Sequence, residues 1–350
     1  MKNNRFRARF SRTTLIAILA ALALMCAGAL AEELTMVETT DALQTLEDGL
    51  YAVQLTGGDG FDDFLAAGGA SSDMEVVSFI GRRMLFGGIK MNVQPFGCSA
   101  FTVPSTAGGR LFGRNFDWYS GETWILEAHP DNGYASIATV NMDFLGGNVT
   151  AALPASARKL AAYYAPLDGM NEVGLYVAVL YIEDRTVIDQ QTDRPDITTT
   201  TAIRMLLNKA ATVEEAVDLL GQYDFHASMG MVVHLAIADA GGSMAAVEYV
   251  DDEMIVTPTQ VLTNFYLAEG EKQGIGSAQS HMRYDTLTAL LDGTDAMTPG
   301  DVRDALDSVS KHNFNDGETT VWSMVCDQLG GTVTYYHRED YSKGWTISLK

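Results

Sequence analysis

A stretch in the first third of the chain, residues 96–118, places the tightest constraint on the fold. It carries Cys98 at the head of an alternating polar and apolar run, and a glycine pair at 108–109 separates this run from a second one. Two such runs on either side of a glycine turn are typical of a β-hairpin. The second run ends with Arg114 and Asp117, so the hairpin is expected to return a cation and a carboxylate beside the thiol.

The bulk composition describes a globular, acidic protein. Of the 350 residues, 47% are hydrophobic and 19% are charged, which is enough apolar material for a large core. The formal net charge is −22, so electrostatic attraction to nucleic acid is not expected. Composition gives no sign of oligomeric state, and a homo-oligomer therefore stays open.

The N-terminus has the pattern of a secretory signal peptide. A basic stretch without acids precedes an apolar run from Leu15 to Leu24, and small residues at 29–31 are suited to cleavage. The apolar run is short for a membrane anchor. We therefore expect residues 1–31 to be removed and the mature protein to be secreted or otherwise extracytoplasmic, without stable membrane insertion.

Downstream of residue 98, strand patterns are followed by helix patterns and then by strands again. Strands are expected at 174–181 and 232–238, and helices at 198–208 and 282–291, before two closing strands. Periodicity alone therefore predicts a mixed α and β protein in which helices cover the sheets.

The hairpin carries the motif G-R-N-F-D at 113–117, and Cys98 followed by this motif resembles the choloylglycine hydrolase family, which comprises bile salt hydrolases and penicillin V acylases. This family is a branch of the N-terminal nucleophile hydrolases. Further patches follow in the family's order: D-G-M-N-E-V-G-L at 168–175, L-T-N at 262–264, S-H-M-R-Y at 280–284 and T-V-W-S-M-V-C-D at 320–327. The resemblance implies an α+β fold, the αββα four-layer sandwich, over residues 98–350.

The resemblance also implies catalytic roles for six residues. Cys98 would be the nucleophile at a mature N-terminus, and its α-amine, with a pKa near 7.7–8.0, suits removal of a thiol proton whose pKa is near 8.5. Arg114 and Asp117 would support the thiolate and the ammonium. Asn264 and Tyr181 would stabilise the oxyanion, with Tyr181 standing where penicillin V acylases carry a tyrosine and bile salt hydrolases an asparagine. Arg283 would lie near the nucleophile.

Residues 32–97 precede the part of the chain that resembles the family. We interpret them as a propeptide-like segment that is removed, by self-cleavage or by another protease, to expose Cys98. Within it we expect short helices at 39–48 and 73–88. Gly97 suits a scissile bond because a residue without Cβ tolerates strained backbone. Cys326 is expected to pack as a small buried residue and not to form a disulfide, since a nucleophilic cysteine must stay free.

The predicted function is hydrolysis of the linear amide C–N bond of a small-molecule N-acyl compound. Phe101, Phe116, Trp118 and Phe144 are the candidates for an apolar acyl pocket, because they are close to the site in sequence. No cofactor is expected, and the six histidines show no metal-binding spacing. Two alternatives stay open: an acyltransferase of the acyl-CoA:6-aminopenicillanic acid type, and an exported ligand-binding protein that has lost catalysis.

Overall fold

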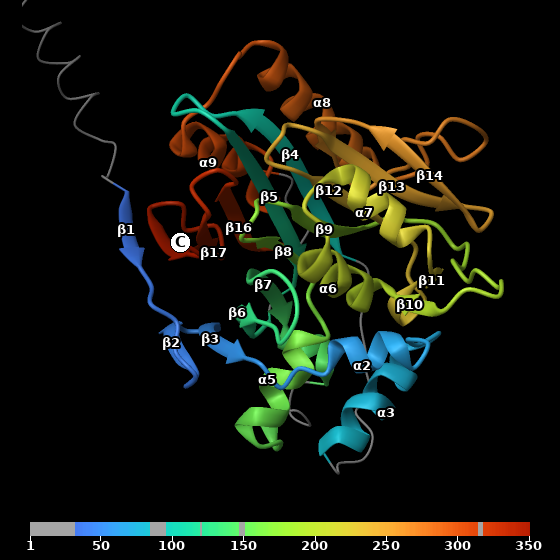
Figure 1. The fold of residues 1–350 in the computed structure, drawn as a ribbon. Helices are drawn as coiled ribbons and strands as arrows, with labels where there is room; N and C mark the ends of the chain where they lie inside the picture. Colours follow the sequence, from blue (N-terminus) through green and yellow to red (C-terminus); the bar gives the residue numbers. More distant parts are fainter. Residues whose placement is uncertain (1–31, 85–95, 120, 147–150, 314–317) are drawn as a thin grey trace, which may run out of the picture.

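Two β-sheets lie face to face between two layers of helices in the computed structural model (Figure 1). The structure describes residues 32–84, 96–119, 121–146, 151–313 and 318–350. The expected αββα four-layer sandwich is thereby confirmed. The signal-peptide prediction for residues 1–31 lies outside the described residues.

The first sheet has the strand order β1-β18-β17-β16-β5-β4-β15. Its strands are β1 (Glu33–Met36), β4 (Gly97–Pro104), β5 (Arg110–Trp118), β15 (Val261–Leu262), β16 (Thr319–Asp327), β17 (Thr332–His337) and β18 (Lys343–Ser348). The second sheet has the order β14-β13-β12-β9-β8-β7-β6-β3-β2. Its strands are β2 (Gln44–Glu47), β3 (Leu50–Thr56), β6 (Thr123–His129), β7 (Ser136–Asn141), β8 (Asp168–Asn171), β9 (Tyr176–Tyr181), β12 (Val233–Ala238), β13 (Met244–Val250) and β14 (Glu253–Pro258).

The helices divide between the outer faces of the two sheets. Helices α8 (Ala278–Asp292) and α9 (Pro299–Ser308) contact the first sheet, while α5 (Ala155–Tyr163), α6 (Thr199–Lys209) and α7 (Val213–Leu220) contact the second. The remaining elements are α2 (Phe61–Ala66), α3 (Asp73–Met84), β10 (Asp196–Thr198), β11 (Asp224–His226), and the short 3-10 helices Met142–Leu145, Ser228–Gly230 and Lys311–Asn313. Within the described ranges, no helix is long and apolar enough to cross a membrane.

The predicted hairpin of β4 and β5 forms the centre of the first sheet. Its turn uses Gly108 and Gly109, whose φ angles of 93° and 75° are costly for residues with a Cβ. Both strands are buried on both faces, because the second sheet packs on one side and helices α8 and α9 on the other. The antiparallel register pairs Cys98 with Phe116 and Ala100 with Arg114.

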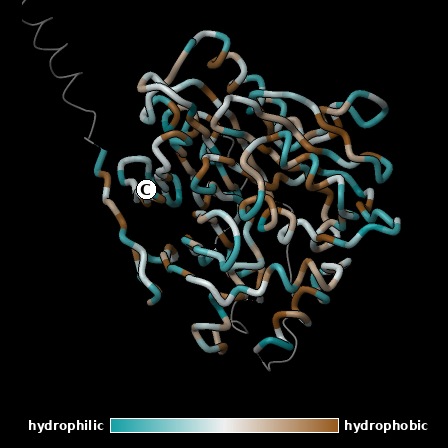
Figure 2. Tube along the Cα trace, in the orientation of Figure 1, coloured by the Kyte–Doolittle hydropathy of each residue, from teal (hydrophilic) through white to brown (hydrophobic). Residues whose placement is uncertain are grey.

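Apolar residues form two cores on opposite sides of this hairpin. The larger core fills the space between the sheets and beneath α6, and hydrophobic colours follow the paired strands there (Figure 2). The smaller core lies under α8 and α9 and includes Phe101, Leu287 and Val302. Because side chains alternate along a strand, neighbouring residues of β4 contribute to different cores.

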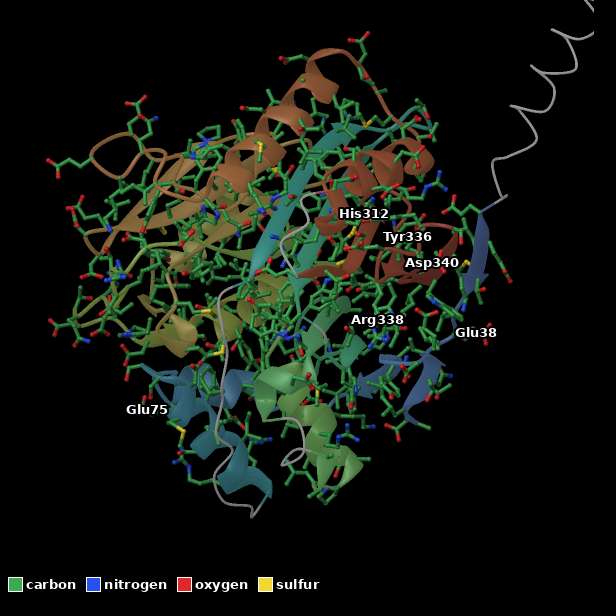
Figure 3. The ribbon with its side chains drawn as sticks, turned by 180° about the vertical axis from the view of Figure 1, so that it is seen from behind. Glu38, Glu75, His312, Tyr336, Arg338 and Asp340 are labelled. Carbon is green, nitrogen blue, oxygen red and sulfur yellow. The ribbon has the colours of Figure 1, made fainter. Side chains whose placement is uncertain are left out.

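Residues 32–84, which are most of the described part of the segment predicted to be a propeptide, are built into both sheets. Strand β1 pairs in parallel with β18, and β3 pairs in parallel with β6 from Leu50 to Thr56. Phe61 and Phe64 of α2 are buried in the large core. Seen from behind, Arg338 lies near this segment (Figure 3), and its guanidinium is 3.5 Å from the Asp48 carboxylate.

One of the two helices predicted in this segment is wrong. Residues 44–47 form strand β2, not a helix, and β2 pairs with β3. Gly49 lies in the turn of this hairpin, with φ 82°. The other predicted helix is confirmed as α3 up to Met84, and its remainder lies outside the described residues.

Candidate active site

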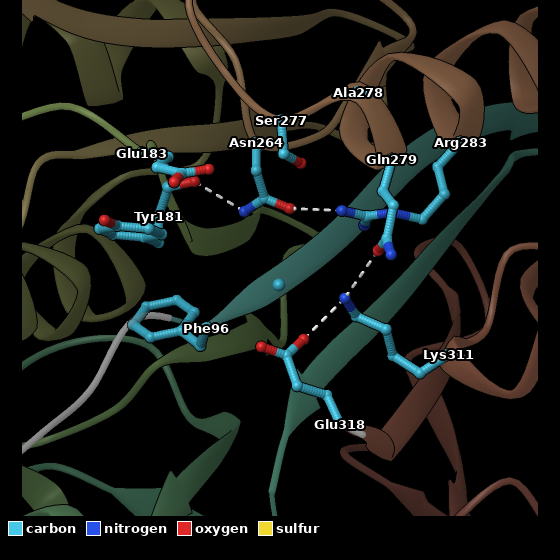
Figure 4. A pocket seen from close by; sticks show the side chains of 11 residues that line it. Phe96, Tyr181, Glu183, Asn264, Ser277, Ala278, Gln279, Arg283, Lys311 and Glu318 are labelled. Atoms are coloured by element: carbon cyan, nitrogen blue, oxygen red, sulfur yellow. Dashed lines mark hydrogen bonds and ion pairs between the residues drawn. The ribbon is translucent and has the colours of Figure 1, made fainter. Parts of the chain in front are cut away.

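The candidate site is an open hollow beside the start of β4, where the two sheets and α8 meet (Figure 4). Its volume is about 400 Å³, and it opens to solvent. Its lining residues are Phe96, Gly97, Tyr181, Glu183, Asn264, Ser277, Ala278, Gln279, Arg283, Lys311 and Glu318. The hollow has aromatic rings at Phe96 and Tyr181, with the Glu183 carboxylate beside Tyr181, and further charged groups at Lys311, Glu318 and Arg283 (Figure 4).

The Cys98 thiol points into the space between the sheets. The residue is 0% exposed, and Sγ lies 3.8 Å from the main-chain oxygen of Val179 on β9 of the opposite sheet. Burial raises the pKa of the Cys98 thiol to about 12, and the nearby Arg114 guanidinium opposes this rise. The thiolate therefore depends on Arg114 for electrostatic support.

Arg114 is held in place by a buried carboxylate. Its Nε donates to Oδ2 of Asp168 at 2.5 Å, and Trp322 Nε1 donates to the same oxygen at 3.0 Å. Arg114 and Asp168 are both 0% exposed. The two terminal nitrogens of Arg114 have no hydrogen-bond partner among the described residues, so they are available to an anion at Cys98.

The main-chain nitrogen of Cys98 faces a different set of groups from the thiol. It donates to Oδ1 of Asn264 at 2.7 Å. Asp117 pairs with Gly97 across the hairpin and lies on the opposite face of the sheet from the thiol. Its carboxylate accepts from Thr320 Oγ1 at 2.8 Å and lies 3.5 Å from Nη1 of Arg283. This side therefore offers acceptors for an α-amine formed at Cys98.

Asn264 reaches Cys98 because the short strand β15 pairs with β4. Leu262 lies opposite Ala100, so the antiparallel chain brings Asn264 level with Cys98 two residues later. The main-chain nitrogen of Asn264 donates to Ser280 Oγ at 2.6 Å, and its Nδ2 donates to the main-chain oxygen of Tyr181 at 2.6 Å. These contacts fix the amide beside the nucleophile.

A buried histidine and glutamate support the Asn264 turn from the other side. His234 Nε2 lies 2.7 Å from the main-chain oxygen of Thr263, and its Nδ1 lies 2.9 Å from Oε1 of Glu248. Glu248 also accepts from the main-chain nitrogens of Leu267 and Ala268 at 2.9 and 2.6 Å. The histidine therefore positions the backbone next to Asn264 and does not face the hollow.

Arg283 on α8 joins the parts of the site. Its Nη2 donates to Asn264 Oδ1 at 2.9 Å, and its Nη1 donates to Ser99 Oγ at 2.8 Å and to the main-chain oxygen of Cys98. The residue is 1% exposed. Arg283 thus contacts the backbone of the nucleophile and the amide, as its predicted position near the nucleophile requires.

Gly97 is required for space. A Cβ at this position would lie 2.8 Å from Asp117 Oδ2 and 3.0 Å from Cε of Lys311. Gly97 is absent from the residues with positive φ in the described chain, so close packing, and not the strained backbone suggested by the sequence, explains the glycine.

The structure brings together the six residues predicted to be catalytic: Cys98, Arg114, Asp117, Asn264, Arg283 and Tyr181. The predicted acyl-pocket residues Phe116, Trp118 and Phe144 also cluster, with Phe144 5.0 Å from Trp118 and 6.2 Å from Phe116 between ring centroids. Phe101 does not join them, because it packs in the core under α8 and α9 on the other face of the sheet.

Three polar residues that shape the site were not predicted from the sequence. Asp168 begins one of the patches that resemble the family but was assigned no role in the site, yet it holds Arg114. Lys311 packs against Gly97, and its Nζ lies 2.6 Å from Oε2 of Glu318. The D-G-M-N-E-V-G-L motif that begins at Asp168 could have indicated a role for this residue, whereas Lys311 and Glu318 belong to no motif.

Comparisons with known proteins agree with this geometry. The model of "Linear amide C-N hydrolases, choloylglycine hydrolase family" matches residues 98–265. Two crystal structures of variants of the conjugated bile acid hydrolase from Clostridium perfringens align with TM-scores of 0.55 and 0.50. The sequence identities are 17% and 15%. The aligned residues cover 72% and 69% of this chain and 92% and 89% of the hydrolase. Penicillin V acylase from Agrobacterium tumefaciens aligns at 20% identity and a TM-score of 0.48, over 69% of this chain and 83% of the acylase.

The likeness to the two bile acid hydrolase structures shows the fold, which is the αββα sandwich of N-terminal nucleophile hydrolases. Residues 98–265 match the model of the choloylglycine hydrolase family of linear amide C–N hydrolases. Among curated proteins, no sequence matches the chain.

Proposed function

We propose that this protein is a secreted amidase that cleaves the linear C–N bond of an N-acyl compound through an acyl-enzyme on Cys98. The observation that carries this proposal is the division of groups around Cys98. Unpartnered Arg114 nitrogens lie on the thiol side, and Asn264 Oδ1 accepts from the main-chain nitrogen at 2.7 Å. A cation for the thiolate and an acceptor for the amine are the two groups that a cysteine acting as its own base needs.

Maturation would use the same sulfur. The Cys98 thiol adds to the carbonyl carbon of Gly97, the C–N bond to Cys98 breaks, and the thiol proton passes to the nitrogen. Water then hydrolyses the thioester, which releases a Gly97 carboxylate and restores the thiol. The products are a new chain that begins at Cys98 with a free α-amine and an N-terminal fragment that ends at Gly97.

Turnover would repeat this chemistry on the substrate. The α-amine of Cys98 takes the thiol proton, the thiolate attacks the amide carbonyl, and the amine returns the proton to the leaving nitrogen. Asn264 and Tyr181 stabilise the oxyanion, and Asp117 orients the ammonium. Water then releases the acyl group as an acid.

An assay on a panel of N-acyl anilides tests this proposal directly. Hydrolysis releases acid and aniline in equal amounts and supports the amidase. Transfer of the acyl group to an added amine, outpacing hydrolysis, would favour the acyltransferase alternative. Binding without any turnover by protein whose Gly97–Cys98 bond is intact would favour a ligand-binding protein.

Replacing Asn264 with alanine is expected to lower kcat about 10²–10³-fold, because one oxyanion donor is lost. Substrate KM should change much less, since the donor acts mainly on the tetrahedral intermediate. Steady-state kinetics measure both parameters. The matched control is Asn313→Ala, an exposed asparagine outside the hollow, which should keep wild-type kcat. An Asn264→Ala enzyme with unchanged kcat would remove this residue from the oxyanion site.

Cleavage after Gly97 is expected to leave a two-chain protein in which residues 32–97 stay bound to residues 98–350. Pairing of β3 with β6 and burial of Phe61 and Phe64 hold residues 32–84 in the fold without the peptide bond. Denaturing electrophoresis should show two fragments that elute together at native mass in size-exclusion chromatography. An active 98–350 chain that elutes alone would show that the segment is a disposable propeptide.

Export is proposed from the basic and apolar pattern of residues 1–31. Mass spectrometry of the protein recovered outside the cytoplasm should then give an N-terminus close to residue 32.

A further inference from the structure

The residue just before the scissile glycine fills an aromatic pocket. Phe96 is 3% exposed, and its ring centroid lies 5.2 Å from Phe116, 6.0 Å from Tyr181 and 6.2 Å from Phe144. Figure 4 shows the ring turned toward Tyr181, away from Lys311 and Glu318. Phe96 is therefore seated among apolar rings and separated from the charged side of the hollow.

The walls of this pocket are fixed from behind. Phe116 stacks on Trp322 with centroids 3.9 Å apart, and Phe144 packs edge-on against Trp118 at 5.0 Å. Phe116, Phe144 and Trp322 are each at most 3% exposed. A pocket with such supported walls should keep its shape when its occupant leaves.

The bonds that self-cleavage breaks and forms show which part of a substrate the Phe96 side chain corresponds to. In the self-cleavage proposed above, the acyl group that Cys98 receives is the Gly97 carbonyl with everything before it in the chain. In turnover the same sulfur receives the acyl group of the substrate. The Phe96 side chain therefore lies in the half of the site that takes the substrate's acyl chain.

We infer that Phe96 occupies the acyl subsite of the uncleaved protein, and that the cleaved enzyme accepts there a neutral acyl chain with an aromatic ring at its end. This inference rests on the proposed function and specifies its substrate class. Between the Gly97 carbonyl carbon and the ring stand Cα and N of Gly97 and the carbonyl carbon, Cα and Cβ of Phe96. A 6-phenylhexanoyl group places its ring at the same separation from the scissile carbonyl.

The charged side of the hollow argues against a charged acyl chain in this subsite. Arg283, Lys311 and Glu318 line the part of the hollow away from the Phe96 ring. Aromatic rings adjoin the Phe96 ring, and a small cavity beside it is lined mainly by uncharged side chains such as Leu167, Val179 and Met231. The charged group on this side is the Glu183 carboxylate next to Tyr181, which would repel an anionic acyl chain (Figure 4). An ionised group among these rings would be buried without a partner, which is costly. A neutral aromatic end is instead favoured by edge and offset contacts with the walls.

Binding of 6-phenylhexanoate tests the subsite without turnover. The probe is titrated into the protein while tryptophan fluorescence is followed, because Trp118 and Trp322 adjoin the pocket. The uncleavable Cys98→Ala variant should not bind, since Phe96 fills the pocket, whereas the double variant Phe96→Ala/Cys98→Ala should bind. The control Phe79→Ala/Cys98→Ala removes a ring from a separate cluster, beside Phe64 and Tyr164, and should not bind.

Turnover by the cleaved enzyme is the second test of the acyl subsite. The kcat/KM for 6-phenylhexanoyl anilide should exceed that for hexanoyl anilide by about ten-fold or more. A Phe144→Ala enzyme should lose most of this ratio. Equal rates for the two anilides, with no binding by Phe96→Ala/Cys98→Ala, would overturn the inference and leave the amidase standing. Binding by that double variant alone, in a protein that hydrolyses no amide, would support the subsite and refute the amidase.

Discussion

Replacing Cys98 with alanine is expected to abolish amide hydrolysis, lowering kcat at least about 10⁴-fold, and to leave the Gly97–Cys98 bond intact. The sulfur lies near the Arg114 guanidinium, and the main-chain nitrogen of the same residue donates to Asn264, the proposed oxyanion donor. Initial rates and denaturing electrophoresis measure the two effects together.

The other described cysteine supplies the control for this substitution. Cys326 is also 0% exposed and free, so Cys326→Ala removes a buried sulfur without touching the hollow. It should cost about 1 kcal/mol of stability and keep both cleavage and turnover. Cys98→Ala protein that still cleaves itself and turns over substrate would contradict the assigned nucleophile.

Replacing Arg114 with leucine is expected to affect stability and chemistry together. The change leaves Asp168 buried without its cation, which should cost about 3–5 kcal/mol in the free energy of unfolding. Burial raises the pKa of Cys98 and Arg114 lowers it, so removing Arg114 should raise this pKa further. The acid limb of the pH–rate profile should therefore move to higher pH. Denaturant titration and the profile of kcat/KM against pH measure these two effects.

A double variant separates the structural role of Arg114 from its chemical role. Arg114→Leu/Asp168→Asn removes both charges, so most of the stability should return while activity stays low. Arg110→Leu, on the same strand but only partly buried, is the control and should change stability by less than about 1 kcal/mol. Recovery of full activity in the double variant would show that Arg114 acts only through folding.

Much of the central hairpin could be predicted because its information is local. The glycine pair at 108–109 fixes the turn, and the alternation of side chains then sets the register that brings Arg114 near Cys98. The same alternation explains why Phe101 was misplaced. It stands an odd number of residues from Cys98, so it must face the other side of the sheet.

The rest of the site depends on contacts between distant segments. Asp168 reaches Arg114 across 54 residues, and Lys311 reaches Gly97 from the far end of the chain. Strand β2 was misread as a helix because its partner is supplied by the hairpin with β3, and a strand's preference is set largely by its neighbours. Phe96 carried no motif, and only the surrounding rings reveal where its side chain lies.

The most direct test of the account is the covalent state of the active protein. Rapid quenching during turnover of an N-acyl anilide, followed by peptide mass spectrometry, should yield a peptide that begins at Cys98 and carries the acyl group on sulfur. Hydroxylamine should remove that group, as expected for a thioester. Turnover by a chain whose Gly97–Cys98 bond is intact, or an acyl group found on any other residue, would contradict the account.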